Sequence, residues 1–308
     1  MSRLSKSIKR WLVQLLAALL SNADFRGFAT GTVYSGKLKQ ICVPGLNCYS
    51  CPGALGSCPL GALQTMLADP QYKMSFYVTG VLAVFGIVAG RWICGWLCPF
   101  GFLQELLHLP AKLVAKRRKN SGMPRLKRKA PFFFRYTKHV LLLSLVILLP
   151  VFLTDEFGFG APYFCEWLCP SGTIMGALPL FIANPSLAAF IGPLFYIKTS
   201  VAAIIVAGSV ASNRFFCKYL CPLGAIYGLF NRFALTRLVY CGDKCSKCGR
   251  CVSVCVMDID PREARQRMEC ICCGKCIKQC GRNALRMETP KRIFKTYKTG
   301  KAPGTPPV

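Results

Sequence analysis

The sequence predicts a mainly α-helical membrane protein with about four transmembrane helices in two duplicated halves, followed by a small cysteine-rich α+β module. Three observations predict this fold class. The 308-residue chain is 53% hydrophobic and only 17% charged, with a mean hydropathy of +0.39, which is too apolar for an ordinary soluble protein. Its 20 cysteines recur in similar short motifs. Its basic residues gather beside the apolar segments.

The charge balance also favours a membrane protein. Forty Lys and Arg residues against twelve Asp and Glu residues give a net charge of +28. Nucleic-acid-binding proteins have such a balance, but no motif here reads a nucleic-acid groove, so we expect no nucleic-acid partner. Basic groups that flank apolar segments are typical of cytoplasmic loops. The densest group, nine Lys or Arg residues between Lys112 and Lys129, predicts a cytoplasmic loop.

Four apolar segments are candidate spans, and the lipid bilayer is their expected partner. The first covers residues 11–20, and Ser21-Asn-Ala23 after it resembles a signal-peptide cleavage site. We interpret it as a retained helix. The others cover residues 74–90, 140–153 and 199–213, the last expected to start earlier. Residues 173–197 are apolar but contain three prolines, which suits a re-entrant or interfacial segment. Four spans place both termini in the cytoplasm.

One cysteine motif closes apolar segments and repeats along the chain. Cysteines four apart on a helix share a face, and a proline after the second cysteine disfavours helical geometry there. Each pair is therefore half of a four-thiolate site where a helix stops. The copies are Cys51…Cys58-Pro-Leu-Gly61, Cys94-Gly-Trp-Leu-Cys98-Pro-Phe-Gly101, Cys165-Glu-Trp-Leu-Cys169-Pro-Ser-Gly172 and Cys217-Lys-Tyr-Leu-Cys221-Pro-Leu-Gly224.

The expected topology places two of these pairs at the cytoplasmic ends of spans, where they form an inner site: Cys94, Cys98, Cys217 and Cys221. Arg91 and Arg214 each stand three residues before the first cysteine, on the same helical face. Cations there would ease the burial of an anionic cluster and raise its potential. Topological anchoring is the alternative role of these arginines.

The outer segments offer five thiols for the four places of an outer site. We prefer Cys51, Cys58, Cys165 and Cys169, with Cys48 as the reserve. Disulfides are the alternative, because the outer face is oxidising. Glu105 and Glu166 lie beside cysteine pairs and are candidates to accept protons from a quinol. With only His108 and His139 in the chain, we expect no haem.

The C-terminal cysteines follow C-x2-C-x2-C-x3-C twice. This is the spacing of bacterial two-cluster ferredoxins, in which the fourth cysteine of each run binds the cluster of the other run. A zinc ribbon on Cys245/Cys248 and Cys270/Cys273 is the alternative, but it leaves four regularly placed cysteines unused. Cys42, Cys241 and Cys272 are assigned to no site. The two predicted [4Fe–4S] ligand sets are Cys245, Cys248, Cys251, Cys280 and Cys270, Cys273, Cys276, Cys255.

The sequence thus divides into a transmembrane domain (1–232), a two-cluster ferredoxin-like module (233–289) and a disordered basic tail (290–308). Four spans with Arg-x-x-Cys-x-x-x-Cys-Pro-x-Gly at two span ends, followed by this module, resemble the NapH/MauN family of ferredoxin-type membrane proteins. The C-terminal part of NosR and cytochrome-oxidase assembly ferredoxins look related.

The resemblance implies an electron-transfer subunit of the cytoplasmic (inner) membrane, which passes electrons, often from the quinone pool, to a partner redox protein. It implies a part of an oxidoreductase complex rather than an enzyme alone, and we identify no catalytic residue. Besides the two module clusters, we expect one or two in the membrane domain, with quinone as a further candidate ligand. A redox sensor or metalloenzyme assembly factor, and a structural thiol or zinc membrane protein, are the alternatives.

Overall fold

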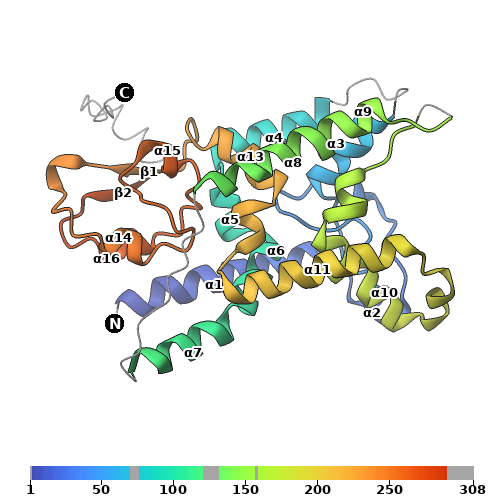
Figure 1. The fold of residues 1–308 in the computed structure, drawn as a ribbon, viewed down its shortest axis with the longest axis horizontal. Coiled ribbons are helices and arrows are strands. Elements are labelled where there is room, and N and C mark those ends of the chain that lie inside the picture. The colour runs from blue at the N-terminus through green and yellow to red at the C-terminus, as the bar shows by residue number, and fades with distance from the viewer. Residues whose placement is uncertain (1, 70–75, 121–131, 157–158, 290–308) are drawn as a thin grey trace.

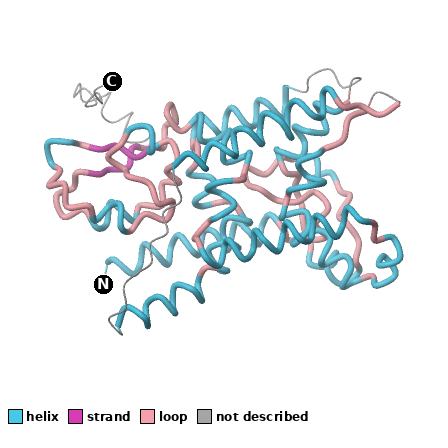
Figure 2. The backbone as a smooth tube through the Cα atoms, in the orientation of Figure 1, coloured by secondary structure: helices cyan, strands magenta, loops and turns pink. Residues whose placement is uncertain are grey.

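Helices make up nearly all of the regular structure in the computed structural model, which describes residues 2–69, 76–120, 132–156 and 159–289 (Figure 2). The predicted disordered tail, 290–308, and part of the basic loop lie outside the described residues. Elements labelled η are short 3₁₀ or π helices. The elements before residue 121 are α1 (Ser2–Ser21), α2 (Phe25–Thr30), η1 (Lys37–Gln40), α3 (Pro59–Ala68), α4 (Phe76–Val88), α5 (Trp92–Trp96), α6 (Pro99–Leu107) and α7 (Leu109–Asn120).

A second group of helices leads to the C-terminal module. Its elements are η2 (Phe132–Tyr136), α8 (Thr137–Leu141), η3 (Leu142–Leu148), α9 (Leu149–Phe152), η4 (Phe164–Leu168), η5 (Gly172–Ala177), α10 (Leu178–Ala183), η6 (Pro185–Phe190), α11 (Pro193–Ala211), α12 (Phe215–Tyr219) and α13 (Pro222–Phe230).

Two helices are long and apolar enough to cross a membrane by length and composition: Phe133–Phe152, which joins η2 to α9, and Pro193–Ala211. Most of their residues face outward, since only 22% and 17% of the tested windows are buried. Exposed apolar surface of this extent is uncommon on soluble proteins. These helices overlap the predicted segments 140–153 and 199–213 but end at Phe152 and Ala211, and the second starts earlier than residue 199, as predicted.

The other two predicted spans are not of this class within the described residues. The first segment, 11–20, lies in α1. The second, 74–90, begins outside the described residues and overlaps α4, which has 13 residues and is a shorter apolar helix. The segment predicted to be re-entrant contains another short apolar helix, Gly172–Ala183. The structure therefore supports a mainly helical fold with two candidate membrane helices, fewer than the four predicted.

The cysteine-rich module contains a small two-stranded sheet, as predicted. Strand β1 (Arg237–Tyr240) pairs antiparallel with β2 (Leu285–Glu288), and Arg237 lies opposite Glu288. The chain between the strands forms η7 (Gly242–Lys244), α14 (Arg250–Ser253), α15 (Ala264–Arg267) and α16 (Lys275–Gln279). Figure 1 shows the sheet at the same end of the molecule as the start of α1 and the end of α7, whereas α2 and α10 lie at the opposite end.

Each inner cysteine pair spans a break between two helices. Cys94 lies in α5, whereas Cys98 is the N-cap of α6 with an extended backbone (φ −76°, ψ 116°). Cys217 in α12 and Cys221 before α13 repeat this arrangement (φ −76°, ψ 110°). The proline after the second cysteine opens the next helix, where its missing N–H is not needed. The prediction that the two cysteines of a pair share one helical face is therefore wrong for the inner pairs. The prediction that each pair stands where a helix stops is confirmed.

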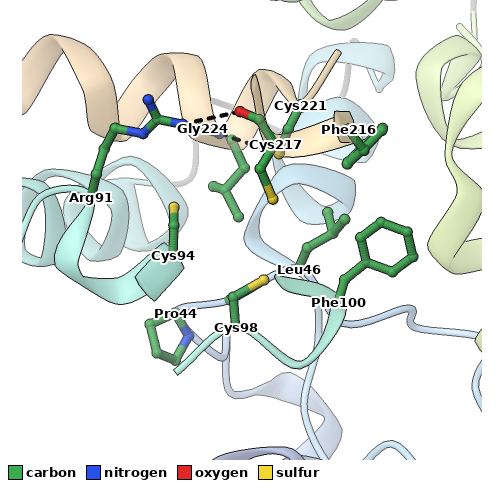
Figure 3. A pocket seen from close by; sticks show the side chains of 12 residues that line it. Pro44, Leu46, Arg91, Cys94, Cys98, Phe100, Phe216, Cys217, Cys221 and Gly224 are labelled. Carbon is green, nitrogen blue, oxygen red and sulfur yellow. Dashed lines mark hydrogen bonds between the residues drawn. The ribbon is translucent and has the colours of Figure 1, made fainter. Parts of the chain in front are cut away.

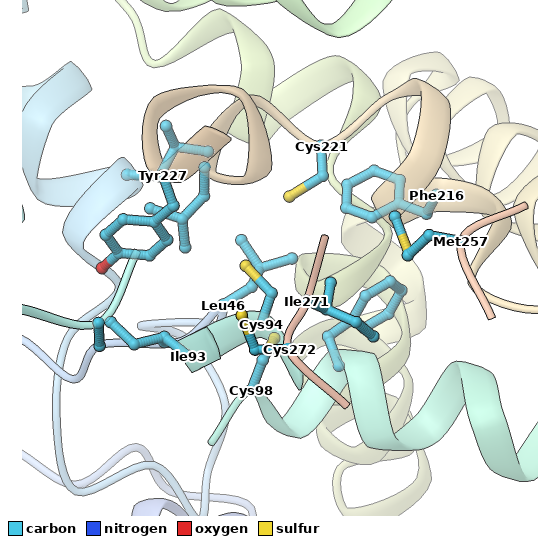
Figure 4. Close-up of a cluster of buried hydrophobic side chains, with 14 of the residues drawn as sticks. Leu46, Ile93, Cys94, Cys98, Phe216, Cys221, Tyr227, Met257, Ile271 and Cys272 are labelled. Atoms are coloured by element: carbon cyan, nitrogen blue, oxygen red, sulfur yellow. The ribbon is translucent and has the colours of Figure 1, made fainter. Parts of the chain in front are cut away.

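The module packs directly on the helices that carry the inner cysteines. Ile271 and Cys272 lie beside Cys94 and Cys98 in one buried apolar cluster (Figure 4). A Cβ on Gly95 would lie 2.2 Å from the Ile271 carbonyl oxygen, so only glycine allows this approach. The indole N–H of Trp96 donates to the Cys272 carbonyl at 3.2 Å. The core is thus continuous from the helices that carry the inner cysteines into the module.

Candidate metal centres

The four inner cysteines line one pocket between α5–α6 and α12–α13 (Figure 3). All four are only 5–6% exposed. Two of them also accept hydrogen bonds from the turn that follows: the N–H of Gly101 donates to Cys98 Sγ at 3.4 Å, and the N–H of Gly224 donates to Cys221 Sγ at 3.3 Å. These N–H groups belong to helix N-termini, which favour negative charge. The structure brings the predicted inner site together and surrounds it with donors.

Arg91 and Arg214, both 0% exposed, hold the two pairs together reciprocally. Arg91 Nη2 donates to the Cys217 carbonyl at 3.0 Å, and Arg214 Nη1 donates to the Cys94 carbonyl. Each arginine thus belongs to one pair and binds the backbone of the other.

Each of these arginines also has a buried nitrogen that bonds to no described atom, Nε of Arg91 and Nη2 of Arg214. Arg91 lines the pocket of the four thiols. A buried unpaired donor beside four thiols fits an anionic ligand. The inner residues therefore suit a [4Fe–4S] cluster, whose thiolate ligands give it negative charge.

The cavity in the outer segments is lined by a different cysteine set from the one predicted. A cavity of about 920 Å³ is lined by Cys48, Cys58, Cys165 and Cys169. The preferred Cys51 does not line this cavity, and its thiol instead donates to Asn22 Oδ1 at 3.5 Å. The N–H of Cys51 donates to the Cys48 carbonyl at 3.2 Å. This turn sends the two side chains different ways, which the spacing of the cysteines does not reveal.

The outer site lacks the arginines of the inner site. Pro162 stands three residues before Cys165, where the inner pairs have arginine. Lys198 instead borders the cavity, and its ammonium lies 3.3 Å from where a Cβ on Gly172 would lie. Glu166 also lines the cavity. None of the 20 cysteines is in a disulfide.

The module brings together both crossed cysteine sets. Cys245, Cys248, Cys251 and Cys280 line one cavity of about 220 Å³. A much smaller pocket of about 10 Å³ is lined by Cys255, Cys270, Cys273 and Cys276, together with Cys272, which was assigned to no site. Within the described residues, no three Cys, His, Asp or Glu side chains converge tightly enough to hold a single metal ion. The module thiols instead line the two pockets.

The two module repeats share one backbone conformation. Lys247 (φ 53°) and Cys272 (φ 51°) each follow the first cysteine of a run by two residues, in the left-handed region that side chains rarely adopt. The N–H of each donates to that first cysteine, Cys245 or Cys270, at 3.4 Å. Since the backbone N–H makes this contact, it does not depend on the side chain. Cys272 in one repeat is therefore equivalent to Lys247 in the other.

Glu269 connects the module to the inner site, and sequence reasoning missed it. Its carboxylate accepts hydrogen bonds from Arg91 and Lys138, all three being at most 9% exposed. Burial alone would raise the pKa of Glu269, but Arg91 and Lys138 lower it to about 2. Asn231 adds a hydrogen bond to the Cys270 carbonyl at 3.0 Å. The second module site therefore lies directly against the inner site.

Glu105 and His108, which were also considered in the sequence, make hydrogen bonds away from the cysteine thiols. Glu105 is 5% exposed and accepts hydrogen bonds from Arg10 and Arg214, so it is an ion-pair partner of the inner site rather than a free proton acceptor. His108 hydrogen-bonds to the Val210 carbonyl. Sequence reasoning also missed two buried glutamines, Gln64 and Gln104, although both stand six residues after the second cysteine of a pair.

Comparison with known proteins identifies the family. A family model described as a 4Fe-4S binding domain matches residues 74–124, 139–183 and 199–240, and each segment contains one Cys-x-x-x-Cys-Pro-x-Gly copy. Two uncharacterized proteins of Methanocaldococcus jannaschii are 31% and 32% identical over 209 and 206 residues, covering 68% and 67% of this chain and 69% and 75% of theirs. The ferredoxin-type protein NapH of Escherichia coli is 22% identical over 247 residues, which cover 75% of this chain and 74% of NapH. No solved structure matches.

The site geometry and these matches define an iron–sulfur protein. The chain belongs to the ferredoxin-type family with the 4Fe-4S binding domain, and the resemblance to the NapH/MauN type is confirmed.

Proposed function

We propose that this chain is an electron-transfer subunit of the cytoplasmic membrane, which carries electrons through four [4Fe–4S] sites between a donor and a partner redox protein. When bound, each cluster would take up and release one electron. The observation that carries the proposal is that the four cysteine sets lie one against the next.

Three contacts link the sets. Leu46 lines both the outer and the inner cavity. Arg91 binds the Cys217 carbonyl of the inner site and also Glu269, the neighbour of Cys270. Within the module, α14 contains Cys251 of one set and contacts α16, which contains Cys276 of the other set. Sites in this series divide a hydrocarbon core of about 30 Å into short steps for an electron.

The two ends of this series are more accessible than its middle. Cys248 at the module end is exposed, and a cavity of about 920 Å³ opens beside the outer cysteines, while the inner cysteines are sealed. Redox partners would therefore meet the chain at its ends. A quinol is our candidate donor, and Glu166 in the outer cavity is the candidate acceptor of its protons. Chemistry on a terminal substrate would belong to partner subunits.

We also propose four spans, with the boundary between membrane domain and module at residues 232–233. Apolar side chains project outward from α1 and α4, as on the two longer helices: Leu20 is 71% exposed and Val84 is 59% exposed. Helix α7, whose sequence is rich in Lys and Arg, ends at the module end of the molecule. Because basic loops tend to remain in the cytoplasm, this supports a cytoplasmic location for the module and both termini.

The iron content tests this proposal. The protein is purified anaerobically in detergent, iron and acid-labile sulfide are measured per chain, and EPR follows stepwise reduction. Four [4Fe–4S] sites predict about sixteen iron atoms per chain, by the four-iron stoichiometry of each cluster. About eight would confine iron to the module, and the transmembrane path would be wrong. A Cys94→Ser/Cys217→Ser variant should lose about four iron atoms and one EPR signal if the inner site holds a cluster.

A further inference from the structure

Two buried glutamines make the same pair of hydrogen bonds at the two membrane sites. At the inner site, Gln104 Nε2 donates to Cys217 Sγ at 3.1 Å, and its Oε1 accepts from the N–H of Phe216 at 3.0 Å. At the outer site, Gln64 Nε2 donates to Cys165 Sγ at 3.2 Å, and its Oε1 accepts from the N–H of Phe164 at 3.0 Å. Both glutamines are 0% exposed.

The placement of these amides follows the internal duplication. Each glutamine stands six residues after the second cysteine of one pair and reaches the first cysteine of the opposite pair. In the other two copies of the motif, this position holds Met175 and Tyr227. Each membrane site therefore receives one amide from its N-terminal half.

The orientation of each amide is set by its surroundings. A backbone N–H next to the target cysteine needs an acceptor, and only the amide oxygen can serve. The NH₂ group must then face the thiol, so the assignment of nitrogen and oxygen does not depend on the amide alone. In the described structure the Cys217 thiol receives no other hydrogen bond, whereas Cys98 and Cys221 receive backbone N–H groups.

We propose that Gln104 and Gln64 are positioning residues that raise the reduction potentials of the inner and outer clusters; this rests on the proposed function. Reduction adds one electron to a cluster, and part of the added negative charge lies on its sulfur atoms. An N–H donor stabilises the reduced state more than the oxidised state, since hydrogen bonds to charged acceptors are the stronger ones. Hydrogen bonds to ligand sulfurs are among the factors that set cluster potentials.

An EPR-monitored redox titration of the full-length protein tests the role of Gln104. Gln104→Met keeps the length of the side chain but removes the donor. Gln104→Glu keeps an acceptor for the N–H of Phe216. For both variants we expect the wild-type iron content and a more negative midpoint for one cluster. The expected shift is about tenfold in the ratio of reduced to oxidised cluster, or about 59 mV for one electron. Gln64→Met should move a different cluster.

Gln14 provides the matched control, because it is a buried glutamine (1% exposed) whose amide bonds to no described atom. Gln14→Met should leave every midpoint unchanged. Unshifted midpoints in both Gln104 variants at full iron content would overturn the inference while leaving the proposed function intact. Loss of the inner iron in both variants would also overturn it, because the amide would then be purely structural. About eight iron atoms in the wild-type protein would instead refute the proposed function itself.

Discussion

Replacing Glu269 with glutamine should loosen the contact between the module and the helices around the inner cysteines. The substitution keeps the shape of the side chain but removes the charge that faces Arg91 and Lys138, both 0% exposed. Removing one partner of a buried ion pair costs about 3–5 kcal/mol, because the remaining charge stays buried and unpaired. The pKa of the Glu269 carboxyl agrees with this sign. Although burial raises it, Arg91 and Lys138 lower it from the ordinary value of 4.5 to about 2, so the folded state stabilises the charged carboxylate.

Hydrogen exchange measured by mass spectrometry reads this cost at the contact itself. A loss of about 3–5 kcal/mol raises the population of the open state by about 10²-fold to about 4 × 10³-fold, at 1.4 kcal/mol for each factor of ten. Backbone amides of residues 268–272 should exchange faster by that factor in Glu269→Gln, with the iron content unchanged. A change of less than tenfold would refute the reasoning.

Glu288→Gln is the matched control, because Glu288 is also buried (9% exposed) but pairs with two arginines, Arg237 and Arg286, whose side chains are 40% and 45% exposed. Water can solvate these arginines when the carboxylate is lost, and ion pairs with exposed partners contribute about 0–1 kcal/mol, so exchange at residues 268–272 should stay near that of the wild type. The dependence on pH has a definite sign. The folded state lowers the pKa of Glu269, so its contribution is complete above the unfolded pKa near 4.5 and is lost as pH falls towards about 2. Glu269→Gln should lack this acid-dependent loss.

Two further predictions concern the outer site and the module contact. Cys48→Ser should lower the iron content by about four atoms per chain by the stoichiometry of one cluster. Cys51→Ser should leave the iron content unchanged, since of these two cysteines Cys48 alone lines the outer cavity. Equal iron loss in both variants would contradict the choice of Cys48 as a ligand. Gly95→Ala should speed exchange at Ile271, because the new Cβ would lie 2.2 Å from its carbonyl oxygen and overpacking costs about 1–3 kcal/mol. Gly80→Ala should not change exchange at Ile271, because nothing lies within 4 Å of the added Cβ. Similar exchange in the two alanine variants would argue against the close contact between Gly95 and Ile271.

Spacing alone predicted the parts of the structure that local chemistry determines. The crossed module sets follow from a run in which each cysteine has a fixed offset, and the structure gathers them in two cavities. The inner set followed from two copies of one motif at equivalent helix ends. In both cases, the residues that must meet carry the same short pattern, so the pattern identifies the partners.

Residues that act across the fold could not be found in this way. Glu269 looks like an ordinary polar residue beside a cysteine, and its role comes from Arg91 and Lys138, more than a hundred residues away. The choice between Cys48 and Cys51 depends on which way a turn directs two side chains, and both are compatible with the spacing. The glutamines carried a readable signal, a shared offset of six residues, but only the structure shows that each crosses to the opposite pair.

The duplication thus keeps one set of contacts constant and varies another. Both membrane sites have a cysteine at a helix N-cap and a glutamine bonded to the opposite thiol. Only the inner site adds two fully buried arginines, whereas the outer site borders a large cavity and a lysine. Buried arginines suit a site that must hold charge away from water, since no solvent is available there to offset it. The outer site instead borders a large cavity. Under the proposed function, the shared contacts would hold a cluster at each site, and the differing contacts would distinguish a sealed relay from a terminus that a partner can reach.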